Sequence, residues 1–412
     1  MFLLKLKYRP TRVHQQVSLL RPGLKPGYGM QQIGRQNGFQ EKLLYIHNKI
    51  LRMADALKSL FFTKNSMEHL GRLIASVEPG FNDEKFLFLV FDDQWENKEL
   101  KERMRHVTLS LHELLPDDYE KAIHILMQVA PSVTGFDAMV FPDYVEVFGL
   151  KHWDLSFQAF ELFTQSCSSE FGVRPFINSD PKRAMEYFYQ WSKSDNEHVR
   201  RLASEGCRPM LPWAMAIPAF KKDPTPVLPI LHQLNNDPSP YVRKSVANNL
   251  NDISKLHPEL VLETCKRWKG KSQNTDWIIK HACRTMLKAG ISDIMEFFGF
   301  GNPAIFDVDM LSLNPERLKI GEELQFSFVL NNQADSRKKV RLEYILHFKT
   351  KNGKFSPKVF QIKETIAEPG EMTILKKHSF KLQTTRKLYP GEHLLEVKVN
   401  GVVKKQGTFQ LL

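Results

Sequence analysis

The spacing of hydrophobic residues changes near residue 300. Between residue 53 and about residue 300, apolar positions recur three and four residues apart, punctuated by Pro and Gly, which predicts one helix after another. From about residue 305 the pattern becomes short alternating runs such as LQFSFVL, VRLEYILHF and HLLEVKV. Turn dipeptides separate these runs at Asn352-Gly353, Pro369-Gly370, Pro390-Gly391 and Asn400-Gly401. The second region is therefore predicted to be an immunoglobulin-like β-sandwich.

Segments of the helical region resemble one another. DNEHVRRLASEGC matches SPYVRKSVANNL when Val199 is set on Val242, and WIIKHACRTML repeats the pattern with Ile279 in the same place. Earlier in the chain, SEFGVRPF resembles SEGCRPML. Periods of about 40 residues are typical of HEAT-like helix pairs, which stack because one pair cannot bury its own apolar face. We therefore expect a mainly α fold, a HEAT-like helical-repeat solenoid followed by the sandwich, with a concave surface lined by the second helices.

Three regions are predicted from these changes: an extension over 1–52, the helical-repeat domain over 53–304 and the immunoglobulin-like domain over 305–412. The extension is rich in Pro, Gly and Gln, and Glu41 is its only acid, a composition that does not bury enough apolar surface to order itself. It also fits an organellar presequence. We favour a translation start assigned too far upstream, or a loose tail, with the domain beginning at Met53.

Charge is unevenly distributed along the chain, whose formal net charge is +12. Residues 1–52 hold ten Lys or Arg and one acid. Residues 53–300 hold 29 Lys or Arg and 33 acids, and residues 301–412 hold 19 Lys or Arg and 12 acids. Bulk charge thus supports nucleic-acid binding only weakly, and a basic groove would need local clustering. No apolar run approaches the roughly 18 residues of a membrane span. The four cysteines lack metal-ligand spacing, which favours a reduced, intracellular protein without a metal site.

A group of acids and cations is expected to converge on the concave surface. The repeat alignment makes Glu170, Glu205 and Asn248 equivalent, with Asp252 one helical turn beyond Asn248 and Trp213 nearby. The nearby cations are Arg200, Arg201, Arg208 and Arg243. Such a mixture suits a phosphate backbone that carries a cationic base, with arginines on the phosphates and the carboxylates and indole on the cation. Alternatively, these polar groups satisfy backbone atoms between layers, and the tryptophan only packs.

Other chemistries find little support in the sequence. It contains no GxxxxGK[ST] loop, no GxSxG elbow and no HExxH motif. His152, His198 and His281 are scattered, and we interpret them as structural. Because helix-hairpin-helix and other DNA-reading motifs are also missing, DNA recognition would rest on groove shape and backbone contacts.

Several of these segments resemble a known family. SEFGVRPF, EHVRRLASEGCRPMLPWA and DPSPYVRKSVANNLNDISKLHPE, with MADALKSLF at Met53, are similar to signature segments of the AlkC branch of the AlkC/AlkD-like DNA alkylation-repair glycosylases. The resemblance covers about residues 53–412. It implies a monofunctional enzyme that hydrolyses the N-glycosidic bond of N3-alkylated bases, 3-methyladenine and 3-methylcytosine, in double-stranded DNA. A cytoplasmic monomer, associated with the nucleoid when acting and without any cofactor or metal, is expected.

The resemblance also assigns roles to residues of this chain. The family's active-site acids fall on Glu170, Glu205 and Asp252, and its aromatic residue falls on Trp213. DNA contacts are expected from Arg200, Arg201, Arg208 and Arg243. Gly172 is expected inside a helix, where it would loosen one turn at a cost of roughly 1 kcal/mol.

One alternative of a different class stays open, a non-enzymatic helical-repeat scaffold that binds protein or undamaged nucleic acid. Convergence of the three acids and Trp213 in one concave site would favour the enzyme, and burial of the acids in separate layers would favour the scaffold. The sequence also leaves open the preferred base, the acid that activates water, and any DNA contact by the sandwich.

Overall fold

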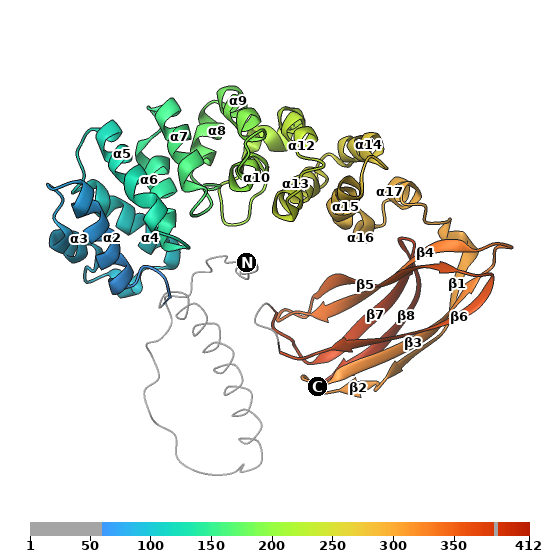
Figure 1. Ribbon diagram of the computed structural model, residues 1–412. Coiled ribbons are helices and arrows are strands. Elements are labelled where there is room, and N and C mark those ends of the chain that lie inside the picture. Colours follow the sequence, from blue (N-terminus) through green and yellow to red (C-terminus); the bar gives the residue numbers. More distant parts are fainter. Residues whose placement is uncertain (1–59, 383–385) are drawn as a thin grey trace, which may run out of the picture.

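The computed structural model describes residues 60–382 and 386–412, so the predicted extension over 1–52 lies outside the described residues. Helices follow one another from Lys64 to Phe297 and form an arch (Figure 1). In chain order they are α2 (Lys64–Val77), α3 (Asp83–Val90), α4 (Leu100–His112), α5 (Tyr119–Val129), α6 (Val140–Phe148), α7 (Trp153–Phe163), α8 (Arg174–Ser179), α9 (Pro181–Trp191), α10 (Glu197–Gly206), α11 (Pro218–Lys222), α12 (Leu228–Gln233), α13 (Pro240–Ile253), α14 (Pro258–Trp268), α15 (Gln273–Ala282), α16 (Arg284–Ala289) and α17 (Ser292–Phe297).

The repeated sequence segments form the inner helices of the arch. Helices α10, α13 and α15 pack side by side, while α9, α12 and α14 lie on the outer side (Figure 1). The equivalent apolar residues Val199, Val242 and Ile279 are all buried, with exposed fractions of 1%, 0% and 2%. Local signals set the helix starts, since the Asn196 side chain accepts a hydrogen bond from the His198 N–H at the start of α10. The predicted helical-repeat solenoid is confirmed.

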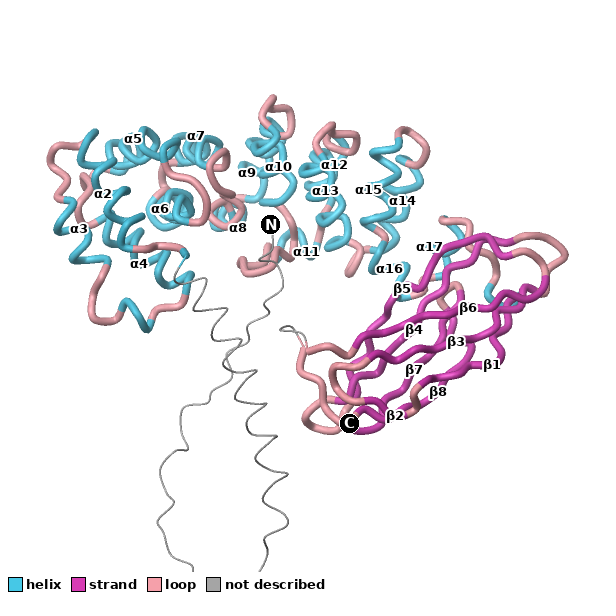
Figure 2. Tube along the Cα trace, turned by 60° about the horizontal axis from the view of Figure 1, so that its bottom comes forward, coloured by secondary structure: helices cyan, strands magenta, loops and turns pink. Residues whose placement is uncertain are grey.

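A β-sandwich follows the arch from Phe306 onward (Figure 2). One sheet has the strand order β1-β3-β6 and the other β2-β8-β7-β4-β5, and all pairs are antiparallel except β2 with β8. The strands are β1 (Phe306–Asn314), β2 (Arg317–Leu318), β3 (Glu323–Asn332), β4 (Lys338–Lys349), β5 (Phe355–Ala367), β6 (Gly370–Ser379), β7 (Gly391–Val399) and β8 (Val402–Leu411). The predicted immunoglobulin-like domain is confirmed.

Alternation and turn chemistry account for the strand boundaries. Along β3 every second residue is buried, so Leu324, Phe326, Phe328 and Leu330 face the core between the sheets. The glycines of the four predicted turns all have positive φ, which L-residues with side chains rarely adopt. Their φ angles are 73° for Gly353, 92° for Gly370, 129° for Gly391 and 89° for Gly401.

Polar contacts and one close backbone approach hold the sandwich to the end of the arch. Lys280 of α15 donates to Glu364 of β5 at 2.6 Å, and Lys398 Nζ of β7 donates to the Lys288 carbonyl at 2.7 Å. At the same junction the backbones of Gly290 and Gly401 meet so closely that a Cβ atom on Gly290 would lie 2.6 Å from the Gly401 carbonyl oxygen. The sandwich is therefore docked on α15 and α16 through charged and backbone groups together.

Candidate active site

Three predicted acids lie at the inner ends of neighbouring repeats. Glu170 occupies the turn before α8, Glu205 lies in the last turn of α10, and Asp252 lies in the last turn of α13. Glu205 is only 6% exposed and Asp252 only 3%, whereas Glu170 is half-buried. Because α10 packs on α13, the repeat brings carboxylates that are 47 positions apart in sequence, Glu205 and Asp252, into one region of the arch.

Two arginines join these acids into one chain of ion pairs. Arg201 pairs with Glu170 through Nη1, and its Nη2 lies 3.5 Å from Glu205 Oε1. Arg208 donates from Nη1 to Glu205 Oε1 at 2.6 Å and from Nε to Asp252 Oδ2 at 2.8 Å. The order Glu170, Arg201, Glu205, Arg208, Asp252 therefore alternates in charge. The acids form one connected site and are not distributed over separate inter-repeat layers.

The arginines keep Glu205 ionised despite its burial. Burial by itself raises the pKa of a carboxyl group, but here the charges of Arg201 and Arg208 and a hydrogen bond from Ser245 outweigh it. The pKa of Glu205 is therefore below its ordinary value. At the Asp252 end of this row of ion pairs, Lys255 Nζ donates to Asp252 Oδ1 at 2.8 Å. Asp252 therefore accepts hydrogen bonds from two cations, Arg208 and Lys255.

A buried arginine fixes the loop that carries Trp213. Arg174, which is 0% exposed, donates from Nη1 to the Gly206 carbonyl at 2.9 Å, from Nη2 to the Arg208 carbonyl at 3.0 Å and from Nε to the Met215 carbonyl at 2.5 Å. These bonds span the loop between α10 and α11. Trp213, at the tip, has a φ of 67° and is 41% exposed. The loop thus presents an accessible indole from a backbone that is tied to the helices at both ends.

Lys101 of α4 connects this loop to the turn that holds Glu170. Its Nζ donates to the Trp213 carbonyl at 3.0 Å and lies 4.9 Å from the centre of the Phe171 ring. Phe171 directly follows Glu170. The tryptophan loop and the acid turn are therefore both in contact with one lysine from a helix more than 100 residues away from Trp213 in the sequence.

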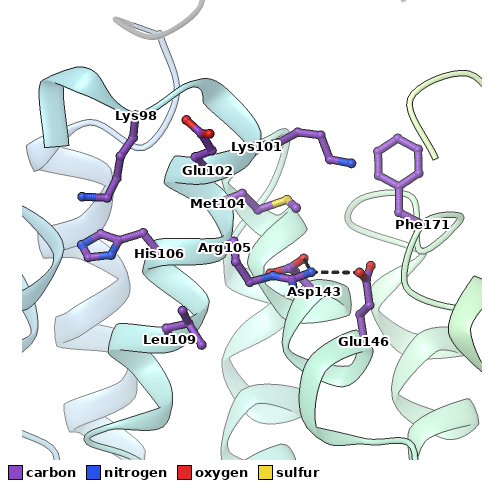
Figure 3. A pocket seen from close by; sticks show the side chains of 10 residues that line it. All are labelled: Lys98, Lys101, Glu102, Met104, Arg105, His106, Leu109, Asp143, Glu146 and Phe171. Atoms are coloured by element: carbon purple, nitrogen blue, oxygen red, sulfur yellow. Dashed lines mark hydrogen bonds and ion pairs between the residues drawn. The ribbon is translucent and has the colours of Figure 1, made fainter. Parts of the chain in front are cut away.

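A pocket of about 500 Å³ opens beside Phe171, between α4 and α6 (Figure 3). Arg105 of α4 connects the two helices there, donating from Nε to Asp143 at 2.8 Å and from Nη2 to Glu146 at 2.8 Å. The pocket is lined by Lys98, Lys101, Glu102, Met104, Arg105, His106, Leu109, Asp143, Glu146 and Phe171. Phe171 lines this pocket and directly follows Glu170 in the sequence, so the pocket and the acid site are adjacent.

Gly172 does not lie inside a helix, and that expectation was wrong. It lies in the turn before α8, where a Cβ atom would come within 2.5 Å of the Pro142 carbonyl oxygen and 2.7 Å of Phe160 Cε1. Ser169 anchors the same turn by donating its hydroxyl to the Phe160 carbonyl at 3.0 Å. The glycine therefore allows the close packing that positions Glu170, and it does not loosen the turn.

Arg200 and Arg243 bond to other partners than the three acids of the site. Arg200 donates from Nε to Asp237 at 2.7 Å, and its Nη1 bonds the Ser194 and Asp195 carbonyls in the turn before α10. Arg243, at the equivalent repeat position, bonds the Asp237 and Pro238 carbonyls in the turn before α13, at 2.8 Å each. Their role in DNA contact stays a prediction, and so do the site roles of the other residues.

Sequence reasoning missed the supporting residues Lys101, Arg174 and Lys255. Arg174 had a signal, because the Arg-Pro dipeptide occurs in both SEFGVRPF and SEGCRPML. Lys101 had none, since its contacts depend on how α4 packs. Among residues 60–382 and 386–412, no group of His, Cys, Asp and Glu has an arrangement that would hold a metal ion, and no helix there is long and apolar enough to span a membrane.

Comparisons with known proteins agree over both parts of the chain. A family model described as "DNA alkylation repair enzyme" matches residues 150–286, and one described as "Uncharacterised protein YhaZ, C-terminal Ig-like domain" matches residues 307–412. "Uncharacterized protein YhaZ" of Bacillus subtilis is 47% identical over 360 residues, which are 87% of this chain and 100% of the relative. The solved structure of Pseudomonas fluorescens alkylpurine DNA glycosylase AlkC, bound to DNA containing an abasic site analog, is 35% identical, has a TM-score of 0.82 and covers 86% of this chain and 99% of its own.

Proposed function

This chain belongs to the AlkC branch of the DNA alkylation-repair glycosylases, and from that premise we propose that it is a monofunctional glycosylase for N3-alkylated bases in double-stranded DNA. The proposed substrates are 3-methyladenine and 3-methylcytosine. The proposed reaction is hydrolysis of the N-glycosidic bond, which needs water and no further cofactor. We propose that the protein acts as a monomer, in the cytoplasm on nucleoid DNA.

The observation that carries this proposal is the single ion-pair chain through Glu170, Glu205 and Asp252. An N3-alkylated base is already a cation, so it can leave without being protonated. Its departure moves positive charge onto the sugar as an oxocarbenium ion, as in glycoside hydrolysis. Ionised carboxylates beside that sugar stabilise the new charge and orient the water that attacks it.

The magnitude of this effect is sufficient for an already weakened bond. A carboxylate about 4 Å from the developing cation contributes up to about 4 kcal/mol at an effective dielectric constant near 20. If all of that acted on the transition state alone, the rate would rise about a thousandfold. Arg201 and Arg208 reduce the field of the acids, but they also hold Glu205 ionised and in place.

We propose different tasks for the three acids from their exposure. The side chain of Glu170 is 16% exposed, against 7% for Glu205 and 4% for Asp252. Glu170 is the acid best able to meet the attacking water, and the two buried acids supply the field. Trp213, exposed at the loop tip, contacts the cationic nucleotide, where a cation–π interaction is worth about 0.5–2 kcal/mol.

Among the predicted DNA contacts, Arg201 and Arg208 lie next to the acids, within reach of a phosphate held there. The bonds of Arg200 and Arg243 to Asp237 and to backbone carbonyls favour a structural role between layers instead. This assignment refines the expectation for all four arginines.

Base release from methylated duplex DNA tests the proposal directly. The full chain is incubated with the DNA and released bases are separated by chromatography. We expect 3-methyladenine or 3-methylcytosine to appear, and release to fall by roughly a hundredfold or more in Glu205→Gln and Asp252→Asn. Glu186→Gln removes an exposed carboxylate from the outer helix α9 and is the matched control.

Folding of each variant is verified by thermal denaturation, because removing one partner of a buried ion pair can cost about 3–5 kcal/mol. No release by a folded wild-type protein that still binds the duplex would contradict the glycosylase proposal and favour the scaffold. Full activity in both acid variants would refute the proposed roles of Glu205 and Asp252.

A further inference from the structure

The polar face that carries the acids continues beyond Asp252 with an excess of positive charge. On α13, Lys244, Asn248 and Asp252 are spaced four residues apart and therefore share one helix face. The neighbouring helices α15 and α16 place His281 and Arg284 against this face, where both contact Asn248. The polar groups thus change from acids paired with arginines at α10 to His281 and Arg284 at α15 and α16.

Arg284 is a half-buried cation whose described hydrogen bonds all go to neutral acceptors. Its Nη1 donates to the His281 carbonyl at 2.6 Å and its Nη2 donates to Asn248 Oδ1 at 3.0 Å. Burial lowers the pKa of Arg284 below its ordinary value. The charge of Asp252 acts in the opposite direction, and the charge of Arg208 adds to the lowering. Since Asp252 is already bonded to Arg208 and Lys255, Arg284 lacks a counter-ion of its own among the described residues.

Two cations, Arg284 and Lys244, lie near enough to act on His281, whose ring is held in a defined orientation. Its ring stacks on Trp277, with centroids 5.2 Å apart and planes inclined by 4°, and its Nε2 lies 3.4 Å from Asn248 Oδ1. Burial, together with the charges of Arg284 and Lys244, lowers the pKa of His281 to about 4. Lys244 itself is exposed. An anion is therefore the ligand that would relieve the electrostatic repulsion in this cluster.

We propose that Lys244, His281 and Arg284 form a binding subsite for one phosphate group of the DNA strand beside the lesion. This inference rests on the proposed function, because the subsite lies on the same face as Asp252. Arg284 uses two of its five N–H donors in the bonds that orient it, which leaves donors for phosphate oxygens. Lys244 adds an exposed charge at the solvent edge, and protonation of His281 follows binding.

The salt dependence of DNA binding tests the subsite. Fluorescence anisotropy of the full chain with a short duplex that carries an abasic-site analogue gives Kd over about 50–200 mM salt. We expect Lys244→Gln and Arg284→Gln each to weaken binding and to reduce the slope of log K against log salt by about 1. Wild type would then lose roughly fourfold more affinity than either variant over that salt range.

Two controls separate this result from general effects of charge and folding. Lys266→Gln removes an exposed lysine from the outer helix α14 and should leave the slope unchanged. Arg284→Lys keeps the charge and should retain most of the slope, which a variant that simply misfolds would not do. Slopes equal to wild type in both Lys244→Gln and Arg284→Gln overturn the subsite.

Titration of the His281 ring by NMR provides a second readout. The duplex should raise the pKa of His281, because a bound phosphate stabilises the imidazolium. A pKa that inorganic phosphate raises and the duplex does not would overturn the assignment to DNA, and a pKa unchanged by both would overturn the subsite.

The subsite and the proposed function fail differently. Base release by wild type with unchanged slopes removes the subsite and leaves the glycosylase standing. A reduced slope without base release supports the phosphate subsite and contradicts the glycosylase.

Discussion

Lys101 Nζ donates a hydrogen bond of 3.0 Å to the carbonyl oxygen of Trp213, across 112 positions of sequence. The bond ties the loop after α10 to a helix near the beginning of the arch. It also places the lysine over the ring of Phe171, next to Glu170. The tip of the tryptophan loop is thus held by a residue that belongs to a different repeat.

We predict that Lys101→Met lowers the activity of the enzyme, because the loop that carries Trp213 is then held less firmly. The bond is exposed, so its loss should cost under about 1 kcal/mol, and kcat/KM for base release should fall roughly threefold. Lys151→Met, an exposed lysine without these contacts, should behave as wild type. Equal kcat/KM values for wild type and Lys101→Met would contradict a positioning role for Lys101.

A larger effect is expected at Arg174. Its guanidinium donates to three backbone carbonyls in a fully buried position, and burial lowers its pKa only to about 10, so it stays charged at neutral pH. A lysine keeps the charge but cannot donate along three such directions. Arg174→Lys should therefore lower the free energy of unfolding by about 3 kcal/mol, measured by chemical denaturation, and reduce base release as well. A variant as stable as wild type would show that these bonds contribute little.

The depressed pKa of Glu205 predicts a pH dependence of stability. A carboxyl group with a lower pKa in the folded than in the unfolded protein stabilises the fold above its unfolded pKa, about 4.3 for Glu, and this contribution is lost as pH falls through the folded value. The free energy of unfolding of wild type, measured with denaturant, should therefore decrease below about pH 4.3. In Glu205→Gln it should decrease less over the same pH interval. Identical pH profiles would show that Glu205 is not the group responsible.

The junction between arch and sandwich depends on two glycines. At Gly290 a Cβ atom would lie 2.6 Å from the Gly401 carbonyl oxygen, and the φ of Gly290 is 79°. Gly299 has a similar φ of 75° but open space around its Cβ position. Gly299→Ala should cost about 1 kcal/mol from backbone strain alone. Gly290→Ala should lower the free energy of unfolding clearly more than Gly299→Ala does, as measured by thermal denaturation. Equal losses of stability in the two variants would exclude the steric contact with Gly401 as a cause.

Much of the fold was predictable because its signals are local. Val199, Val242 and Ile279 recur at one repeat position and all are buried, since each inner helix must hide the same face. The turn glycines Gly353 and Gly370 needed positive φ, which the neighbouring residue types already indicated. Gly172 shows the limit of such reasoning, because its necessity comes from the Pro142 carbonyl and the Phe160 ring, which are distant in sequence.

The sequence by itself determined the repeat, the change from helices to strands, and the presence of three acids at equivalent or adjacent repeat positions. Only the tertiary structure decided which cation each acid meets. Arg200 and Arg201 are neighbours in sequence, yet about 100° of helical rotation separates them, so Arg200 turns to Asp237 between layers while Arg201 reaches Glu170. Composition and spacing do not specify how each helix is rotated against its neighbours. Packing does, and it thereby determines which charges form the site.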